Sequence, residues 1–153
     1  MKKIFLSAIF SVLTLFLKAT KPHVVHVSVN TENSTVKWKG SKISSSHEGT
    51  VNILKGILNI DHGTLVGGQF SIDMKSLATT DMSEEYNKKL DDHLKNEDFF
   101  NVSDFPTASI TITNALKGEG NSYKVIADLT IKGITHPISF AVFFPFLLTL
   151  LLK

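Results

Sequence analysis

The 153-residue sequence contains no cysteine and no arginine. Without cysteine the chain has no disulfide, thiolate metal site, cysteine nucleophile or lipid-modified lipobox residue. Without arginine it lacks the guanidinium groups that bind phosphates and base edges through paired hydrogen bonds. Three of its 16 lysines precede residue 20, so the other 134 residues carry 13 lysines against 14 acidic residues, a formal charge of −1. A nearly neutral body of this kind argues against nucleic acid as a partner.

Motifs of catalysis and metal binding are also missing from the sequence. It contains neither the Gly-x-Ser-x-Gly motif of serine hydrolases nor a phosphate-binding glycine-rich loop. None of its six histidines is in the HExxH pattern of a metal site. The adjacent acidic residues Asp91 and Asp92 have lysines nearby, which favours a solvated surface over a pair of catalytic carboxylates. We therefore expect no enzyme activity, no metal site and no cofactor.

Residues 1–19 are typical of a secretory signal peptide. Lys2 and Lys3 precede a mostly apolar stretch at positions 4–17, and Ala19 offers a small residue for cleavage. The alternative is a membrane anchor, but such a stretch would span only about 21 Å as a helix, less than the roughly 30 Å of a bilayer core. We therefore expect residues 1–19 to be removed and the protein to be periplasmic or secreted.

Apolar and polar residues alternate through the body of the sequence, with the period of two that is typical of strands with one buried face. Eight strand candidates follow one another at short spacing, which predicts an antiparallel barrel or sandwich. The first two candidates, at residues 25–29 and 36–40, are expected to form a hairpin. Lys55-Gly56 is expected to be a turn between two further strands, at residues 51–53 and 57–60.

One helix is expected after residue 81, because Asp81 and Glu84 have the spacing of a capping box. An apolar stripe recurs along it at every fourth position: Met82, Tyr86, Leu90 and Leu94. Its other side offers acidic and basic residues four positions apart: Glu84 and Lys88, Glu85 and Lys89, Asp91 and Lys95. The helix therefore covers an apolar surface. The aromatic residues that follow it, at positions 99–100 and 105, predict a loop that closes one end of a barrel.

Four segments of the body, in their order and spacing, resemble the YceI-like family of lipid or polyisoprenoid-binding proteins. The segments are STVKWKGSK (34–42) with SHEGTV (46–51), GGQFSIDM (67–74), HLKNEDFFNV (93–102) with Phe105-Pro106, and DLTIKGITHPISF (128–140). The resemblance implies an exported, lipocalin-like antiparallel β-barrel with one helix, which holds a long isoprenoid chain in its apolar interior. His47 and His93 lie in these segments, and we expect them to make polar contacts at the cavity mouth or to lock the helix to the sheet.

The resemblance ends at Phe140, because family members continue through a polar loop into strands that complete the barrel. Here an apolar run follows instead, with Pro145 and Thr149 as its interruptions. Alternation is lost in this run, so we expect no strand beyond about Val142 and no membrane span. We divide the chain into a signal peptide (1–19), a β-barrel domain (23–142) and an aberrant apolar tail (143–153), and we expect a frameshifted or truncated gene product. The barrel is then left open beside its first strand.

The inward faces of the strands are the predicted functional surface. In a small barrel such an apolar set either fills the core or lines a ligand cavity. The resemblance favours a cavity for an isoprenoid or another long-chain lipid, with transient membrane contact left open. The predicted ligand-binding residues are Trp38, Val51, Ile53, Phe70, Ile72, Met74, Phe99, Phe100, Ile110, Ile112, Val125, Ala127 and Leu129. The alternative is a structural or interaction barrel with a packed core and no ligand.

Overall fold

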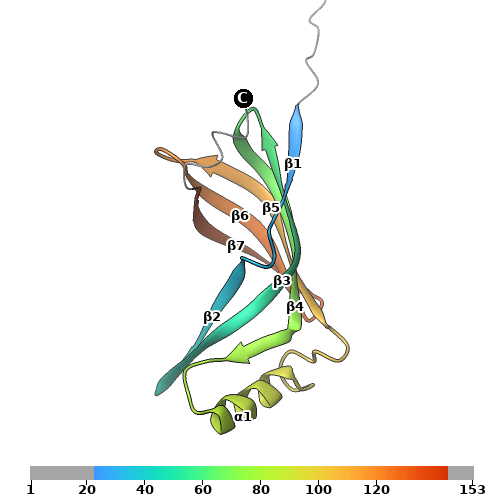
Figure 1. Cartoon of the computed structure of the whole chain (residues 1–153), viewed down its shortest axis with the longest axis vertical. Helices are drawn as coiled ribbons and strands as arrows, with labels where there is room; N and C mark the ends of the chain where they lie inside the picture. Colours follow the sequence, from blue (N-terminus) through green and yellow to red (C-terminus); the bar gives the residue numbers. More distant parts are fainter. Residues whose placement is uncertain (1–22, 145–153) are drawn as a thin grey trace, which may run out of the picture.

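The computed structural model describes residues 23–144, which form seven strands and one helix (Figure 1). The elements are β1 (Val24–Ser28), β2 (Thr35–Lys42), β3 (Ser45–Asp61), β4 (Thr64–Thr79), α1 (Glu84–Lys95), β5 (Thr107–Lys117), β6 (Ser122–Ile131) and β7 (Ile134–Phe143). Every strand pair is antiparallel. The predicted fold class, an antiparallel β-structure with one helix, is confirmed. The predicted signal peptide and positions 145–153 of the predicted tail lie outside the described residues.

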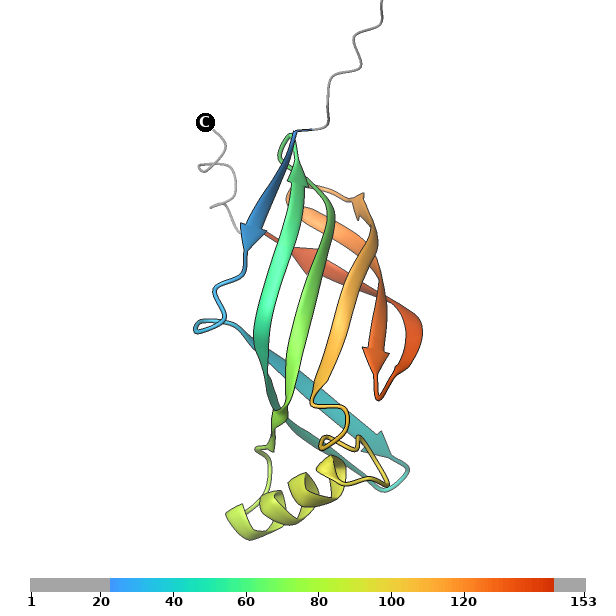
Figure 2. The same cartoon turned by 90° about the vertical axis from the view of Figure 1, so that its right-hand side faces the viewer.

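The sheet has the strand order β1-β3-β4-β5-β6-β7, and β2 also pairs with β3 (Figure 2). At 17 residues, β3 is long enough to pair with two strands: β1 lies along its C-terminal half and β2 along its N-terminal half. The predicted hairpin of β1 with β2 is therefore wrong. Alternation along the sequence identified both strands but could not show that a longer third strand is the partner of each.

Lys55-Gly56 is part of β3 and makes no turn, so residues 51–53 and 57–60 belong to one strand and the predicted number of eight was too high. A register shift between Ile53 and Lys55 marks a bulge at this point. A Cβ atom on Gly56 would lie 2.7 Å from Cδ1 of Phe70 and 2.9 Å from Cγ2 of Val29. The glycine therefore serves close packing inside the sheet, which a sequence pattern does not distinguish from chain reversal.

Three hairpins in the sheet have two-residue turns, and in two of them both turn residues have positive φ. His62-Gly63 joins β3 to β4 with φ angles of 47° and 78°, and Lys132-Gly133 joins β6 to β7 with 50° and 74°. Positive φ at both central positions is the type I′ geometry, which matches the twist of the flanking strands and favours glycine.

Near its end β4 bends toward α1 (Figure 1). Between the pairs Asn52↔Asp73 and Thr50↔Ala78, one residue of β3 faces four residues of β4. The backbone N–H of Asn52 donates to Oγ of Ser76 at 2.8 Å, which bridges the irregular stretch. The bend buries Met74 and Leu77 beneath the helix end of the sheet.

The sheet is not closed: within residues 23–144, β7 pairs with β6 alone. β7 runs to Phe143, and Ile138 and Val142 pack on the core beneath the sheet, with Phe140 lining a cavity. The strand ends at Phe143, close to the predicted limit of about Val142, and its inner face continues past Phe140. Because outward-facing residues such as Phe143 are also apolar, the period of two was hidden.

Helix α1 starts after Ser83, whose side chain makes no capping hydrogen bond, so the predicted capping box at Asp81 is absent. Leu94 is buried and Leu90 packs against the core, whereas Tyr86 on the predicted stripe is 59% exposed. The outer side carries the predicted pair Lys89–Glu85 at 2.6 Å and a second pair that was not predicted. That second pair is Lys88–Asp92, also at 2.6 Å.

Candidate ligand cavity

Two apolar cavities lie along the concave side of the sheet. The helix-end cavity, of about 360 Å³, is lined by Val36, Trp38, Lys39, Gly40, Val51, Ile72, Met74, Leu77, Leu94, Phe99, Phe100, Ala108, Ile110, Leu129 and Ile131. The open-end cavity, of about 310 Å³, is lined by Val36, Ile53, Leu58, Leu65, Phe70, Ile72, Ile110, Ile112, Phe140, Val142 and Phe144. Each volume falls in the range of small-molecule sites, which are mostly apolar.

The two cavities share three lining residues, Val36, Ile72 and Ile110. These come from β2, β4 and β5, so the cavities meet at the middle of the sheet. Together they form one apolar surface from the helix to the open side of the sheet. An elongated hydrocarbon fits such a surface better than a compact polar molecule, because the side chains of the lining carry no oxygen and Lys39 is its one charged group.

Of the 13 residues predicted to bind the ligand, 11 line one or both cavities. The two exceptions are Val125 and Ala127, which are 0% exposed and belong to the solid part of the core. They pair with Phe140 and Ile138 of β7. Their neighbours on the same face of β6, Leu129 and Ile131, reach the helix-end cavity. Alternation assigned these residues to one face correctly but could not separate packed from open positions along it.

Several lining residues were not predicted. In the helix-end cavity they include Leu77, Leu94 and Ala108, and in the open-end cavity they include Leu58, Leu65, Phe140, Val142 and Phe144. Leu94 lay on the predicted helix stripe, and Phe140 and Val142 continue the alternation of β7. The helix stripe was visible in the sequence, whereas the inner face of β7 was obscured by apolar residues on its outer face. The lining residues were missed because the helix was treated as a cover and the C-terminal segment as a tail.

The loop after α1 lines the helix-end cavity with two aromatic rings, Phe99 and Phe100, as predicted, whereas Phe105 lines neither cavity. Phe99 and Phe100 contact each other edge to face, with ring centroids 4.6 Å apart and an interplanar angle of 84°. Backbone hydrogen bonds hold the loop on the end of the helix: Phe100 N–H donates to the Leu94 carbonyl at 3.1 Å, and Val102 N–H to the Lys95 carbonyl at 2.9 Å. The rings are therefore fixed in position by the main chain that carries them.

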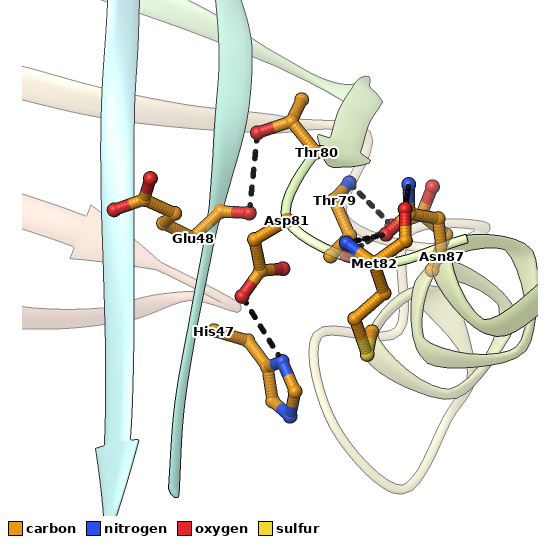
Figure 3. Close-up of polar contacts among 8 residues, drawn as sticks. His47, Glu48, Thr79, Thr80, Asp81, Met82 and Asn87 are labelled. Carbon is orange, nitrogen blue, oxygen red and sulfur yellow. Dashed lines mark hydrogen bonds and ion pairs between the residues drawn. The ribbon is translucent and has the colours of Figure 1, made fainter. Parts of the chain in front are cut away.

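Polar contacts tie the helix and the segment before it to the sheet, and we call them the helix latch (Figure 3). They involve Asp91 with Thr79, Thr80 with Glu48, and His47 with Asp81. Oδ1 of Asp91 accepts hydrogen bonds from the backbone N–H of Thr79 at 2.7 Å and from its hydroxyl at 2.6 Å. The N–H of Thr80 donates to the Glu48 carbonyl at 3.0 Å. Because Asp91 bonds to β4, the predicted pair of Asp91 with Lys95 is not formed among the described contacts.

His47 belongs to the same latch. Its Nδ1 lies 3.2 Å from Oδ2 of Asp81, which joins β3 to the segment before the helix (Figure 3). Of the two hypotheses for His47, this contact supports the one in which it locks the helix to the sheet. His93 instead lies beside Phe99, with ring centroids 6.0 Å apart.

Apart from Lys39, the charged residues within 23–144 do not line either cavity. The hydrogen bond from Lys88 to Asp92, together with the attraction of that carboxylate, raises the pKa of Lys88 above its ordinary value of 10.5. Within residues 23–144 no three His, Asp or Glu side chains are placed to hold a metal ion. In that same part of the chain, no helix has the length and apolar character needed to cross a membrane.

The described residues form an open antiparallel sheet with an apolar concave surface and one helix across its end, an architecture suited to binding. The domain model described as "YceI-like domain" matches residues 27–146, and the chain belongs to this family. The match extends six residues past Phe140. The interpretation that the likeness ends at Phe140 is therefore corrected, and β7 belongs to the family domain.

Relatives match parts of the chain. Over 80 residues it is 31% identical to a UPF0312 protein of Yersinia enterocolitica, covering 47% of this chain and 41% of that protein. Over 48 residues it is 44% identical to a UPF0312 protein of Photorhabdus laumondii, covering 31% and 24%. The matched segments thus span less than half of these relatives. The crystal structure of BcnA from Burkholderia cenocepacia covers 78% of this chain and 65% of its own, with 20% identity and a TM-score of 0.43.

Proposed function

We propose that this protein is a non-catalytic binding protein for long apolar chains, with an isoprenoid or a similar lipid as its ligand. The observation that carries the proposal is the pair of apolar cavities that share Val36, Ile72 and Ile110. Membership of the YceI-like family supports it.

The energetics of such a ligand suit these cavities. Each CH₂ group that a hydrocarbon buries is worth about 0.8 kcal/mol, and this contribution needs no charged or hydrogen-bonding partner. Apolar cavities are poorly suited to hold water, because water needs polar partners. A flexible chain that extends through both cavities would therefore gain free energy at every point of contact. A compact polar ligand would lose its hydration and find little to replace it.

A direct test is native mass spectrometry of the purified protein, followed by organic extraction. We expect an added mass that is released into the solvent as an isoprenoid or another long-chain lipid, or uptake of added geranylgeraniol when the protein is purified empty. The absence of both a bound mass and uptake would contradict the proposal.

A matched pair of variants locates the ligand. Ile110 lines both cavities, whereas Ile57 is 44% exposed and lines neither of them. Ile110→Trp should fill the point where the cavities meet and reduce uptake of geranylgeraniol at least tenfold, about 1.4 kcal/mol. Ile57→Trp should leave uptake unchanged. Equal uptake by the two variants would place the ligand elsewhere.

We further propose that the protein is exported and works in the periplasm or outside the cell. The lysines and apolar stretch of residues 1–19 support this proposal. The mass of the protein recovered from the periplasmic fraction tests it. A chain shortened by 19 to 22 residues is expected, and a full-length chain in the cytoplasm would contradict export.

A further inference from the structure

The one tryptophan of the chain, Trp38, has an indole ring on the wall of the helix-end cavity. The ring lies against Gly49, its pairing partner on β3. A Cβ atom on Gly49 would lie 2.7 Å from both Cε2 and Cζ2 of the ring, and this distance is too short for any side chain at position 49. Gly49 thus leaves room for the indole edge that carries Nε1.

The indole N–H has no hydrogen-bond acceptor among residues 23–144, although its nitrogen is buried. Such orphaned donors are rare in native proteins, and each calls for a physical explanation. The side chains that line the same cavity supply no oxygen, because they are aliphatic or aromatic apart from Met74 and Lys39. An acceptor brought by a ligand would remove the penalty of the unpaired N–H.

We propose that the Trp38 N–H donates a hydrogen bond to a neutral oxygen at one end of the bound apolar chain. This inference rests on the proposed function and names the class of ligand: a long hydrocarbon that ends in an alcohol, ether, ester, ketone or amide. The oxygen lies in the helix-end cavity, and the hydrocarbon extends past Ile72 and Ile110 into the open-end cavity. Only the helix-end cavity has a donor of this kind.

A neutral end group fits the surroundings of Trp38 better than an anion. Burying a carboxylate or phosphate needs a buried positive partner. Lys39 lines the cavity but is an exposed residue, so it does not supply a buried positive charge. The indole N–H is an uncharged donor and suits an uncharged acceptor.

The test compares three ligands with the same fifteen-carbon chain: farnesol, farnesyl methyl ether and the hydrocarbon farnesene. The ether matters because it accepts a hydrogen bond and donates none. Affinities are measured by isothermal titration with the wild-type chain and with Trp38→Phe, which keeps an aromatic ring and loses the donor. The ratio of ether to hydrocarbon affinity should fall by about tenfold in Trp38→Phe. Using the ratio cancels the different hydrophobicity of the two ligands and any loss of stability common to both measurements.

A second readout needs no variant. Because the chain has one tryptophan, its ¹H–¹⁵N spectrum contains one indole resonance, which reports on Trp38 alone. Farnesol and the ether should move that proton downfield, and the hydrocarbon should not. This measurement keeps the inference testable if Trp38→Phe folds poorly.

The outcomes separate the inference from the proposed function. If no ligand binds the wild-type chain, the proposed function fails. If all three bind, with an unchanged affinity ratio in Trp38→Phe and the same indole shift, the inference about Trp38 is overturned and lipid binding stands. Farnesoic acid is the last arm: if it binds more tightly than the ether and loses that advantage in Lys39→Gln, the end group is an anion held at Lys39, which also overturns the inference.

Discussion

The two ends of the cavity surface are completed by different interactions. At the helix end, α1 and its loop are held by directional hydrogen bonds, with Asp91 to Thr79 and Thr80 to Glu48 as the main contacts. At the open end, the wall is β7, which within the described chain is hydrogen-bonded on one side only, and Phe140 remains 36% exposed while lining the cavity. The comparison shows that side-chain hydrogen bonds fix the helix end, whereas the open end is formed by backbone pairing of β7 with β6 and by apolar contact.

The difference has an energetic consequence. Hydrogen bonds to a charged acceptor contribute about 1.5–3 kcal/mol each and depend on a particular arrangement of atoms. Apolar burial contributes in proportion to area and tolerates several arrangements. The helix end should therefore be sensitive to the loss of single polar atoms, and the open end to the loss of surface.

The largest effect on stability is expected at Ile72, where the two cavities meet. Ile72 is 6% exposed and lines both cavities, so Ile72→Asp would bury a carboxylate without a partner. We expect a loss of about 4 kcal/mol or more in the free energy of unfolding, together with loss of ligand. Chemical denaturation measures the first. Ile57→Asp, at an exposed position of β3, is the control and should cost less than about 1 kcal/mol; a similar loss in both would show that Ile72 is not specially placed.

The second largest effect on stability is expected from comparing two buried residues, one that lines a cavity and one that is fully packed. Ile112 lines the open-end cavity, whereas Val125 is 0% exposed and lines neither cavity. Val125→Trp should overpack the core and cost about 3 kcal/mol, while Ile112→Trp should fill free volume at a cost near zero and exclude ligand. Thermal and chemical unfolding of both variants decide the matter. Unfolding of Ile112→Trp as severe as that of Val125→Trp would mean that the open end is a solid core.

Local patterns were enough to predict the strands and the helix but not their partners. Alternation at β4 and β6 placed Ile72 and Leu129 on the inner face, because side-chain direction follows from the backbone alone. The partner of β1 depends on the length and bend of β3, and neither is encoded near β1. The prediction of a turn at Lys55-Gly56 was wrong for a related reason: the close packing that requires glycine at position 56 comes from Phe70 on the neighbouring strand β4.

The same limit applies to the cavity. Sequence patterning identified 11 lining residues and added Val125 and Ala127, because it reports which face a residue occupies and not how densely that face is packed. Phe144 could not be predicted from alternation, since its neighbours are apolar on both faces of β7. The latch was also missed, because the lysines near Asp91 in the sequence favoured a solvated carboxylate. In the fold, the bend of β4 places Thr79 beside Asp91.

The helix latch allows a comparison between neighbouring residues. Asp91 accepts two hydrogen bonds from Thr79, whose side chain is buried, while Asp92 pairs with Lys88 on the exposed side of the helix. Asp91→Ala should cost about 2 kcal/mol, because Thr79 is left with an unpaired hydroxyl and N–H. Asp92→Ala should cost between about 0 and 1 kcal/mol. Hydrogen exchange of the α1 amides should accelerate in the first variant only. Equal acceleration in both would remove Asp91 as the residue that fixes the helix end.

The smallest effect is expected at the far side of the open end, where contact area is the one contribution. Phe144 lines the open-end cavity and packs edge to face on Tyr123, with ring centroids 5.7 Å apart, whereas Phe143 is 69% exposed. Phe144→Ala removes part of the cavity wall, and losing about 40 Å² of apolar contact with a ligand corresponds to about 1 kcal/mol. The Kd for geranylgeraniol should therefore rise about fivefold in Phe144→Ala and stay unchanged in Phe143→Ala. Because no hydrogen bond is lost, the farnesyl ether and farnesene should be weakened equally by Phe144→Ala. A selective loss of the ether would show that the polar end of the ligand lies at the open end, which would reverse the contrast between the two ends of the sheet.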